Sequence, residues 1–509
     1  MGSKALKNDR AIVGDTDPAS RNIPKRLRPA KITRPETSVE KTETYRQEKS
    51  QKVFKRTLKS TAVNGAMNLL VIGVQFEDHP ATYSTDKIQP LLFGESGSIA
   101  DYFNDVSYGA VTINPASEFH GTSNDGFIGW LQLSGNHPNT GSDKDHETDY
   151  QTAKNAITVA SDYIDFASYD ADGDADIEST ELAILIIVAG YAAEYSGGND
   201  PSVWSHKSGG SFESDGKYIY EYAMVGEKHG DHMGTIGHMV HELGHLIFDL
   251  PDLYDTDKDN GDSYGIGYFG LMGSDNWGAK YGENGGSSPT HPCAWSKEYL
   301  SWGTVNTITS SQTISLPKGD GNSSSMFRLD TSDPDQYFLI ENRQFSGYDI
   351  GFQRLAGSPG HGGIVIYHID TSKTDMWPGS NDINADENDK GVDVEEANEG
   401  SIGYSMLDTY EKAAHTNMFY FSGNNYSFSN STTPNSRLKN NNATQISITS
   451  ISSYGDTMSA SVTRPPTATT GSVANVELDS ATLNRIFTPS KTHKLFIYGK
   501  IVLFFANNM

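Results

Sequence analysis

Cysteine is scarce and long apolar runs are absent in this chain of 509 residues. The single cysteine, Cys293, excludes an intramolecular disulfide framework and any cysteine-rich zinc site, and we expect it to be a small buried side chain. The longest apolar run, LAILIIVAG at 182–190, is shorter than the roughly 20 residues that span a bilayer. We therefore expect no membrane span and interpret this run as a buried strand.

Positive charge is also scarce, since 39 Lys and Arg oppose 65 Asp and Glu for a net charge of -26. Such an excess of negative charge repels phosphate, which argues against a nucleic-acid partner or an anionic membrane. Residues 1–60 are the exception, because they are basic, polar and proline-containing. Their first residues lack the apolar core of a signal peptide, so we expect either a cytoplasmic protein or a true start that is missing from this chain.

The length predicts two or three domains, because one hydrophobic core rarely serves so many residues. Composition changes along the chain suggest where they meet. The segments that we expect are 1–62 for a largely irregular leader or propeptide remnant, 63–303 for an α/β (α+β) domain, 304–463 for a β-sandwich domain, and 464–509 for a linker and a truncated C-terminal segment.

Apolar periodicity suggests the elements of these segments. Continuous β-branched and apolar runs predict buried strands at 67–76, 182–192 and 217–227. Helical spacing predicts helices at 98–109, 150–166 and 234–248. After residue 304, short alternating runs separated by Gly, Asn, Ser and Asp predict the strands of the sandwich.

The helix predicted at 234–248 contains His241-Glu242-Leu243-Gly244-His245. Residues four apart share one face of a helix, so both imidazoles can bind one Zn²⁺ while Glu242 projects toward a water on the metal. A carboxylate in that place can accept the proton of the water. The pattern predicts a catalytic zinc site, and two histidines on a solvated helix face are the alternative without function.

A catalytic zinc needs a third protein ligand, and Asp249, Asp252 and Asp255 all follow within ten residues of the second histidine. Pro251 cannot lie inside a helix and disfavours helical geometry before it, so the helix must end near 249. Aspartate tolerates the left-handed conformation. We expect Asp249 to form the turn and Asp252 to return to the metal, with Asp249 and then Asp255 as the remaining candidates.

A competing arrangement would take the third ligand from a glutamate on a second helix, for which Glu283 and Glu298 are the candidates. Against it stands Gly270-Leu271-Met272-Gly273, which resembles the tight turn that places a methionine beneath the zinc of metzincin peptidases.

A second motif spaces carboxylates as a calcium loop does. Positions 1, 3, 5, 7, 9 and 12 of such a loop fall on Asp170, Asp172, Asp174, Asp176, Glu178 and Glu181, while position 6 is Ala175 where glycine is usual. Carboxylates gathered without a cation repel each other. We therefore expect a structural Ca²⁺ held by Asp170, Asp172, Asp174, Asp176 and Glu181, with a solvated acidic turn as the alternative. The acidic run at 381–396 is interpreted as a solvated loop.

Around these motifs the sequence resembles the immune inhibitor A family of secreted bacterial metallopeptidases. The resemblance covers roughly residues 65–463, and the segments that carry it are NLLVIGVQFED, ADYFNDVSYG, YIDFASYDADGDADI, VWSHK, LPDLYD, GYFGLMGSDNWG, HPCAWSKEYLSWG, FLIENRQ and GGIVIYHID. The family usually has HExxHxxGxxD, whereas this chain has one additional residue between His245 and Asp252 and no glycine there.

The resemblance implies a secreted zinc endopeptidase with a metzincin-like domain, a β-sandwich behind it and an N-terminal propeptide. Carried over by position, His241, His245 and Asp252 become zinc ligands, Glu242 the general base and Met272 a support under the site. We expect a monomer that acts on protein and peptide substrates. The alternatives are a catalytically degenerate calcium-binding adhesion protein, which the altered spacing favours, and an intracellular zinc peptidase.

Overall fold

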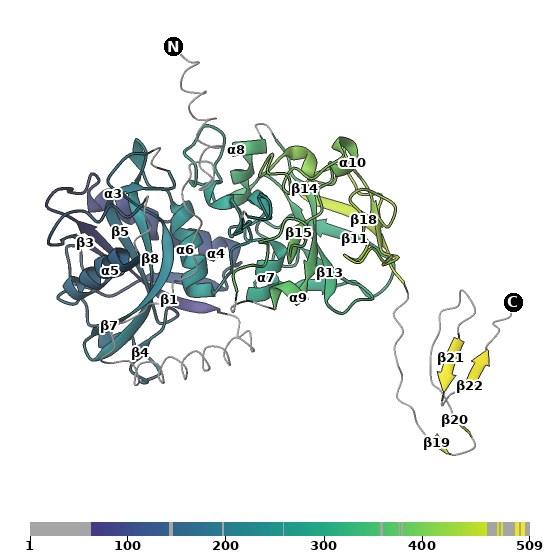
Figure 1. Ribbon diagram of the computed structural model, residues 1–509, viewed down its shortest axis with the longest axis horizontal. Helices are drawn as coiled ribbons and strands as arrows, with labels where there is room; N and C mark the ends of the chain where they lie inside the picture. The colour runs from purple at the N-terminus through teal and green to yellow at the C-terminus, as the bar shows by residue number, and fades with distance from the viewer. Residues whose placement is uncertain are drawn as a thin grey trace, which may run out of the picture.

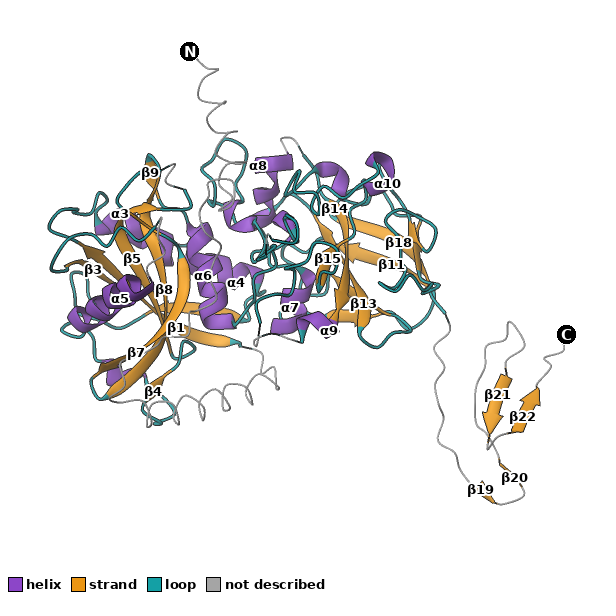
Figure 2. Cartoon of the chain, viewed as in Figure 1, coloured by secondary structure: helices purple, strands orange, loops and turns teal. Residues whose placement is uncertain are grey.

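The computed structural model describes residues 63–465 and four short strands nearer the C-terminus, without 142–145, 196–197, 258, 357–359, 376 and 378–379. Over these residues the chain is a mixed α/β protein with several sheets and eight α-helices (Figures 1 and 2). The expected leader at 1–62 lies outside the described residues, as does most of the expected segment at 464–509. None of the described helices has the length and apolar character needed to cross a membrane.

The first half of the described chain is built around a nine-stranded sheet whose main path runs β2-β1-β5-β8-β4. Its central strands β1 (Gly65–Gln75), β5 (Leu182–Ala192) and β8 (Lys217–His229) are parallel. They match the three predicted strands, because a parallel strand covered on both faces needs apolar side chains on both. The other strands are β2 (Val111–Pro115), β3 (Phe127–Gln132), β4 (Asp176–Ile177), β6 (Ser202–Val203), β7 (His206–Ser214) and β9 (His232–Met233).

Helices cover both faces of this sheet, and β1 shows how its side chains divide between them (Figure 2). Leu69 belongs to a hydrophobic cluster with α4 (Ile99–Val106) and α6 (Ile236–Phe248), whereas Leu70 belongs to a second cluster with α5 (His146–Ala160). Successive side chains of a strand point to opposite faces. The face of the sheet that includes Leu69 therefore packs against α6, the helix that contains the histidine motif.

The helix α5 differs from the predicted range of 150–166 at both ends, because it begins at His146 and ends at Ala160. The next residues are Ser161 and Asp162, and the chain continues in turns in which the Asp162 amide bonds to Val159 and the Tyr163 amide to Ala160. Serine and aspartate favour turns over helix interiors because their side chains compete for backbone hydrogen bonds. The end predicted at residue 166 was wrong because apolar spacing does not contain this preference for turns.

The helix α6 is buried over its whole length, and its end was predictable from local chemistry. All residues of Ile236–Phe248 are buried, including His238, His241, Glu242 and His245, so the helix is covered on every side and its polar side chains face other parts of the protein. Asp249 has φ 51° and ψ 38°, and its amide donates to the carbonyl of Gly244. Pro251 follows two residues later and cannot continue the helix. The predicted left-handed turn at Asp249 is confirmed.

This turn supplies a stability prediction. Replacing Asp249 by valine is expected to destabilise the fold by about 1–2 kcal/mol, because a β-branched residue pays the full steric cost of the left-handed region. Asp249→Gly is the matched control, since glycine adopts this conformation without strain and should retain the wild-type melting temperature. Thermal unfolding of the full chain followed by circular dichroism measures both, and equal melting temperatures for Val and Gly would contradict the assignment.

The second half contains two further sheets. One has the order β10-β12-β13-β14-β15 and the other β11-β18-β17-β16. Apart from the parallel pair β10 and β12, their strands are antiparallel. Their bounds are β10 (Val305–Thr307), β11 (Gln312–Pro317), β12 (Met326–Asp330), β13 (Gln336–Arg343), β14 (Gly363–Asp370), β15 (Val392–Val394), β16 (Phe428–Ser429), β17 (Ser447–Thr449) and β18 (Thr457–Thr463).

One hydrophobic cluster joins the two halves. It includes Leu243 of α6, Trp302 just before the expected boundary at 303, Ile340 of β13 and Ile448 of β17. The boundary itself remains a prediction. The shared cluster shows that α4 and α6 pack together with residues of the five-stranded and four-stranded sheets. The segments that carry the resemblance on both sides of residue 303 thus contribute to one core.

The remaining described elements are short. They are α3 (Thr85–Phe93), α7 (Ala294–Leu300), α8 (Gln353–Ala356), α9 (Thr371–Thr374), α10 (Glu399–Ile402), and the antiparallel pairs β19 (Val476–Glu477) with β20 (Ser480–Ala481) and β21 (Lys494–Ile497) with β22 (Lys500–Leu503). Cys293, at the start of α7, is buried as expected.

Candidate metal centre

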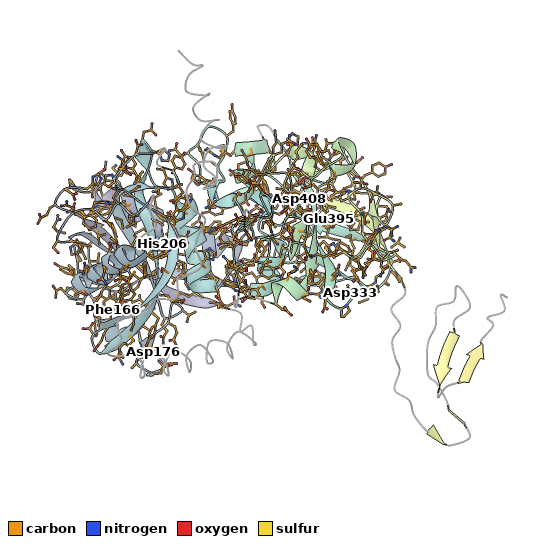
Figure 3. The ribbon with its side chains drawn as sticks, viewed as in Figure 1. Phe166, Asp176, His206, Asp333, Glu395 and Asp408 are labelled. Atoms are coloured by element: carbon orange, nitrogen blue, oxygen red, sulfur yellow. The ribbon has the colours of Figure 1, made fainter. Side chains whose placement is uncertain are left out.

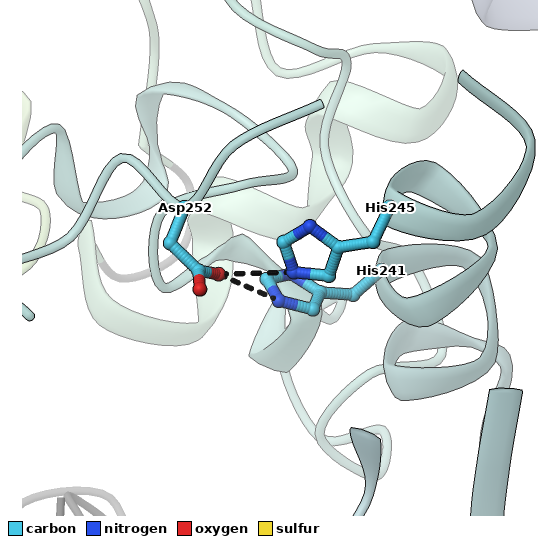
Figure 4. A group of neighbouring side chains, drawn as sticks. All are labelled: His241, His245 and Asp252. Atoms are coloured by element: carbon cyan, nitrogen blue, oxygen red, sulfur yellow. Dashed lines mark ion pairs between the residues drawn. The ribbon is translucent and has the colours of Figure 1, made fainter. Parts of the chain in front are cut away.

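Two histidines of α6 and one aspartate of the following loop converge (Figure 4). The Nε2 atoms of His241 and His245 lie 3.3 Å and 3.1 Å from the same oxygen, Oδ1 of Asp252. All three side chains are buried, and each offers one ligand atom within 4.8 Å of the others. Two imidazole nitrogens and a carboxylate oxygen form a donor set that zinc accepts.

Backbone carbonyl groups orient both imidazoles. Nδ1 of His241 lies 2.9 Å from the carbonyl oxygen of Leu271, and Nδ1 of His245 lies 2.6 Å from that of Leu250. A carbonyl oxygen only accepts hydrogen bonds, so each Nδ1 donates, and this leaves each Nε2 directed toward Asp252. Metal-binding histidines are oriented by partners of this kind. The residues present therefore fit a metal ion.

The loop that carries Asp252 is held on both sides. The backbone amide of Asp252 donates to Oδ1 of Asn381 at 2.8 Å, and Nδ2 of Asn381 donates to Oδ2 of Asp252 at 2.7 Å. Next to it, the Leu253 amide donates to the carbonyl of Met272 at 2.7 Å. Asn381 occupies Oδ2, which leaves Oδ1 as the carboxylate oxygen nearest the histidines.

Met272 lies against the helix between the two histidines. It is buried, and its Sδ lies 3.0 Å from the position that a Cβ on Gly244 would take. Glycine at that place lets the methionine approach the helix backbone closely. The turn at Gly270–Gly273 is closed by a hydrogen bond of 2.9 Å between its end residues.

The other candidate ligands have different surroundings. The carboxylate of Asp255 accepts the amides of Asp257 at 2.9 Å and Ser263 at 3.0 Å. Glu298 accepts the hydroxyl of Tyr337 at 2.7 Å, and Glu283 is exposed. Within the described part of the chain, the ligand group of the two histidines contains only the aspartate at 252 as its third member.

Glu242 is buried on α6, and a second carboxylate, Glu194, influences its surroundings. Burial raises the pKa of the Glu194 carboxyl above its ordinary value, hydrogen bonds from Ser205 oppose this shift, and the negative charge of Glu242 adds to it. Ser205 donates to Glu194 from both its hydroxyl and its amide, and Nε2 of His238 lies 3.8 Å away. A raised pKa favours the neutral form of Glu194, which limits repulsion between two buried carboxylates.

Asn381 and Glu194 belong to no motif in the sequence. Asn381 begins the acidic run that was interpreted as a solvated loop, yet it is hydrogen-bonded to a residue 129 positions away. No local pattern signals such a pairing, because nothing in a short window of sequence depends on a distant partner. A comparison of related sequences would be the only sequence-level signal.

Asn381 should tune metal affinity. Asn381→Ala removes the group that orients Asp252, and loss of such an outer partner is expected to lower zinc affinity about 10–100-fold. Zinc competition with a chromophoric chelator measures the dissociation constant. Asn388→Ala, an exposed residue of the same run, is the control and should leave the constant unchanged. An Asn381→Ala variant with wild-type affinity would exclude an orienting role.

The acidic loop, residues 170–181, brings three of its predicted calcium ligands together. Asp170, Asp172 and Asp174 have carboxylate oxygens within 4.8 Å of one another. Asp176, labelled in Figure 3, is buried in β4, and Glu181 turns back to accept the amides of Ala171 at 2.8 Å and Glu178 at 3.0 Å. The two latter carboxylates do not join the group.

Two further features bear on a cation at this loop. Ala175 has φ 73°, the left-handed conformation for which the sixth position of a calcium loop normally uses glycine. The ammonium of Lys217 lies 2.6 Å from Oδ2 of Asp170, so one carboxylate already has a cationic partner. The loop has the shape of a calcium loop with part of its charge neutralised.

Comparison with known proteins adds no identification. No protein-family model matches the chain, and no curated protein matches it either.

Proposed function

We propose that the protein is a secreted zinc-dependent endopeptidase that hydrolyses peptide bonds in proteins. The observation that carries this proposal is the convergence of two Nε2 atoms on Oδ1 of Asp252, with Nδ1 of each imidazole donating to a backbone carbonyl. The same helix carries Glu242 between the two histidines. This combination of three ligands and an adjacent base is the minimum that a catalytic zinc site requires.

The chemistry follows from the side chains at this site. Zinc, when bound, lowers the pKa of a water ligand and polarises a carbonyl group. Glu242 takes a proton from the attacking water and delivers it to the leaving amine, which must depart protonated. Asp252 and the two histidines hold the ion, and Asn381 orients Asp252.

The proposed fold is a metzincin-like domain followed by a β-sandwich. The turn that returns Asp252 and the methionine packed under the helix support the first part. Two mainly antiparallel sheets whose apolar residues share one cluster support the second. Secretion and a propeptide rest on the resemblance to the immune inhibitor A family.

The additional residue between His245 and Asp252 favoured the alternative of a non-catalytic calcium-binding adhesion protein. The altered spacing no longer favours that alternative, because Oδ1 of Asp252 still lies 3.1 Å from Nε2 of His245 and 3.3 Å from Nε2 of His241. We also propose a structural Ca²⁺ at Asp170, Asp172 and Asp174, supported by their proximity and by the left-handed residue at position 6 of the loop.

One chelation experiment tests both ions. Treatment of the full chain with a chelator should abolish casein hydrolysis, and zinc alone should restore it. Calcium alone should raise the melting temperature without restoring hydrolysis, because the acidic loop is remote from the histidines in the sequence and shares no ligand with them. Undiminished hydrolysis in the metal-free protein would exclude a zinc peptidase, and a melting temperature insensitive to calcium would exclude the calcium site.

A further inference from the structure

A second cluster of metal-ligating side chains lies outside the proposed active site. It consists of Asp105 on α4, His291 just before α7 and Asp320 in the turn after β11, and each offers one ligand atom within 4.8 Å of the others. None of the three belongs to the histidine centre or to the acidic loop. The cluster joins the first half of the described chain to the second.

His291 is the most informative member. The residue is 0% exposed, and neither ring nitrogen has a hydrogen-bond partner among the described residues. Nε2 points toward Asp105, with 3.4 Å between Nε2 and Oδ1, which is too long for a good hydrogen bond. A buried polar group without a partner costs free energy, and a cation bound by a ring nitrogen would offset that cost.

The cations near the cluster are engaged by other carboxylates. Arg343 pairs with Asp349 at 2.6 Å and with Glu341 at 3.0 Å. Burial alone would raise the pKa of Asp349, but the Arg343 guanidinium overrides that effect and holds it at about 2. Lys297 lies 3.8 Å from Glu341 and donates to Tyr108 at 3.1 Å.

The two aspartates of the cluster retain negative charge toward His291. The side chain of Asp105 is 37% exposed and paired with no lysine or arginine among the described residues. Oδ2 of Asp320 accepts the hydroxyl of Ser346 at 2.8 Å and lies 3.2 Å from the ammonium of Lys318. Two carboxylates beside one ammonium leave an excess of negative charge at the imidazole.

We propose that Asp105, His291 and Asp320 bind a divalent transition-metal ion of the zinc class. An imidazole nitrogen is a poor ligand for Ca²⁺ and Mg²⁺ and a good one for zinc. Zinc ligand distances of about 2.0–2.2 Å place ligand atoms about 3.4 Å apart, and Nε2 of His291 and Oδ1 of Asp105 are already 3.4 Å apart.

An ion at this place acts as a cross-link. Asp105 lies on α4, which packs in the same hydrophobic cluster as α6. Asp320 follows β11, the edge strand of the four-stranded sheet. Binding would fix the two halves of the described chain to each other and stabilise the folded state without taking part in hydrolysis. Its effect on stability depends on zinc concentration, because only the folded chain assembles the three ligands.

Metal stoichiometry tests the proposal separately from the proposed function. The full chain is titrated with zinc and bound metal is counted by mass spectrometry. We expect two zinc ions for the wild type, one for His291→Gln and one for His245→Gln. Zinc should raise the melting temperature of His245→Gln but raise that of a His245→Gln, His291→Gln double variant much less.

His368→Gln is the matched control. His368 is also buried beside a carboxylate, with 3.4 Å between its Nδ1 and Glu395, but its Nε2 has Gln336 as a partner at 3.1 Å. This variant should bind two ions. Asp105→Asn keeps the imidazole and should lose the same ion as His291→Gln, which covers the case in which the histidine variant does not fold. Wild-type stoichiometry in Asp105→Asn, or in a folded His291→Gln, would mean that these side chains hold no zinc and would overturn the proposal.

Discussion

Glu242→Gln is expected to lower kcat for casein or peptide hydrolysis by about 10²–10⁴-fold while zinc content stays at the wild-type value. Glutamine has the shape of glutamate but cannot take the proton of the attacking water. Glu242 does not belong to the ligand group formed by the two histidines and Asp252, so the ion should remain bound. Steady-state kinetics and metal analysis on the same preparation measure both quantities.

Glu283→Gln is the control for this substitution. Glu283 is exposed and belonged to the competing arrangement with a glutamate ligand, so its loss should leave both kcat and zinc content unchanged. Glu194→Gln tests the neighbouring carboxylate. It removes a negative charge that repels the charge of Glu242, so the acidic limb of the pH profile should move to lower pH with little change in the maximal rate. Full hydrolysis by Glu242→Gln would exclude this residue as the base.

Asp252→Asn is expected to weaken zinc binding by more than the 10–100-fold typical of an outer partner, because it removes the one carboxylate that the ligand group contains among the described residues. The asparagine variant keeps the size of the side chain and its place in the loop. Activity should fall in parallel and recover in part at high zinc concentration, since the histidines remain. Competition with a chelator of known affinity measures the loss.

The other two aspartates of the loop are the natural controls. Asp249→Asn preserves a residue that tolerates the left-handed turn, and Asp255→Asn retains one acceptor for the amides that its carboxylate binds. Both should keep near wild-type zinc affinity. A large loss in either of these variants, with Asp252→Asn still binding zinc tightly, would move the third ligand to another aspartate.

Local chemistry made much of the fold predictable. The three apolar runs became β1, β5 and β8 because strands covered on both faces need apolar residues throughout. The end of α6 was predictable from two residues, since Pro251 forbids continuation and aspartate accepts a left-handed φ. The end of α5 was predicted wrongly. The apolar spacing extends past Ser161 and Asp162, but the preference of these two residues for turns ends the helix at Ala160.

The sequence by itself determined which residue types were available for a metal and placed two of them on one helical face. His241 and His245 share that face because a helix repeats every 3.6 residues, a property independent of the rest of the chain. The position of the turn at Asp249 followed from the same kind of local argument. The preference for Asp252 was therefore a consequence of backbone geometry within a dozen residues.

Only the tertiary structure decided what surrounds these residues. The carbonyl of Leu271 orients the His241 ring from 30 residues away, and Asn381 holds Asp252 from 129 residues away. The cluster at Asp105, His291 and Asp320 joins three segments that no motif connects. The physical reason is that such contacts form when distant segments bury a common core, and their free energy depends on packing that no short window of sequence contains.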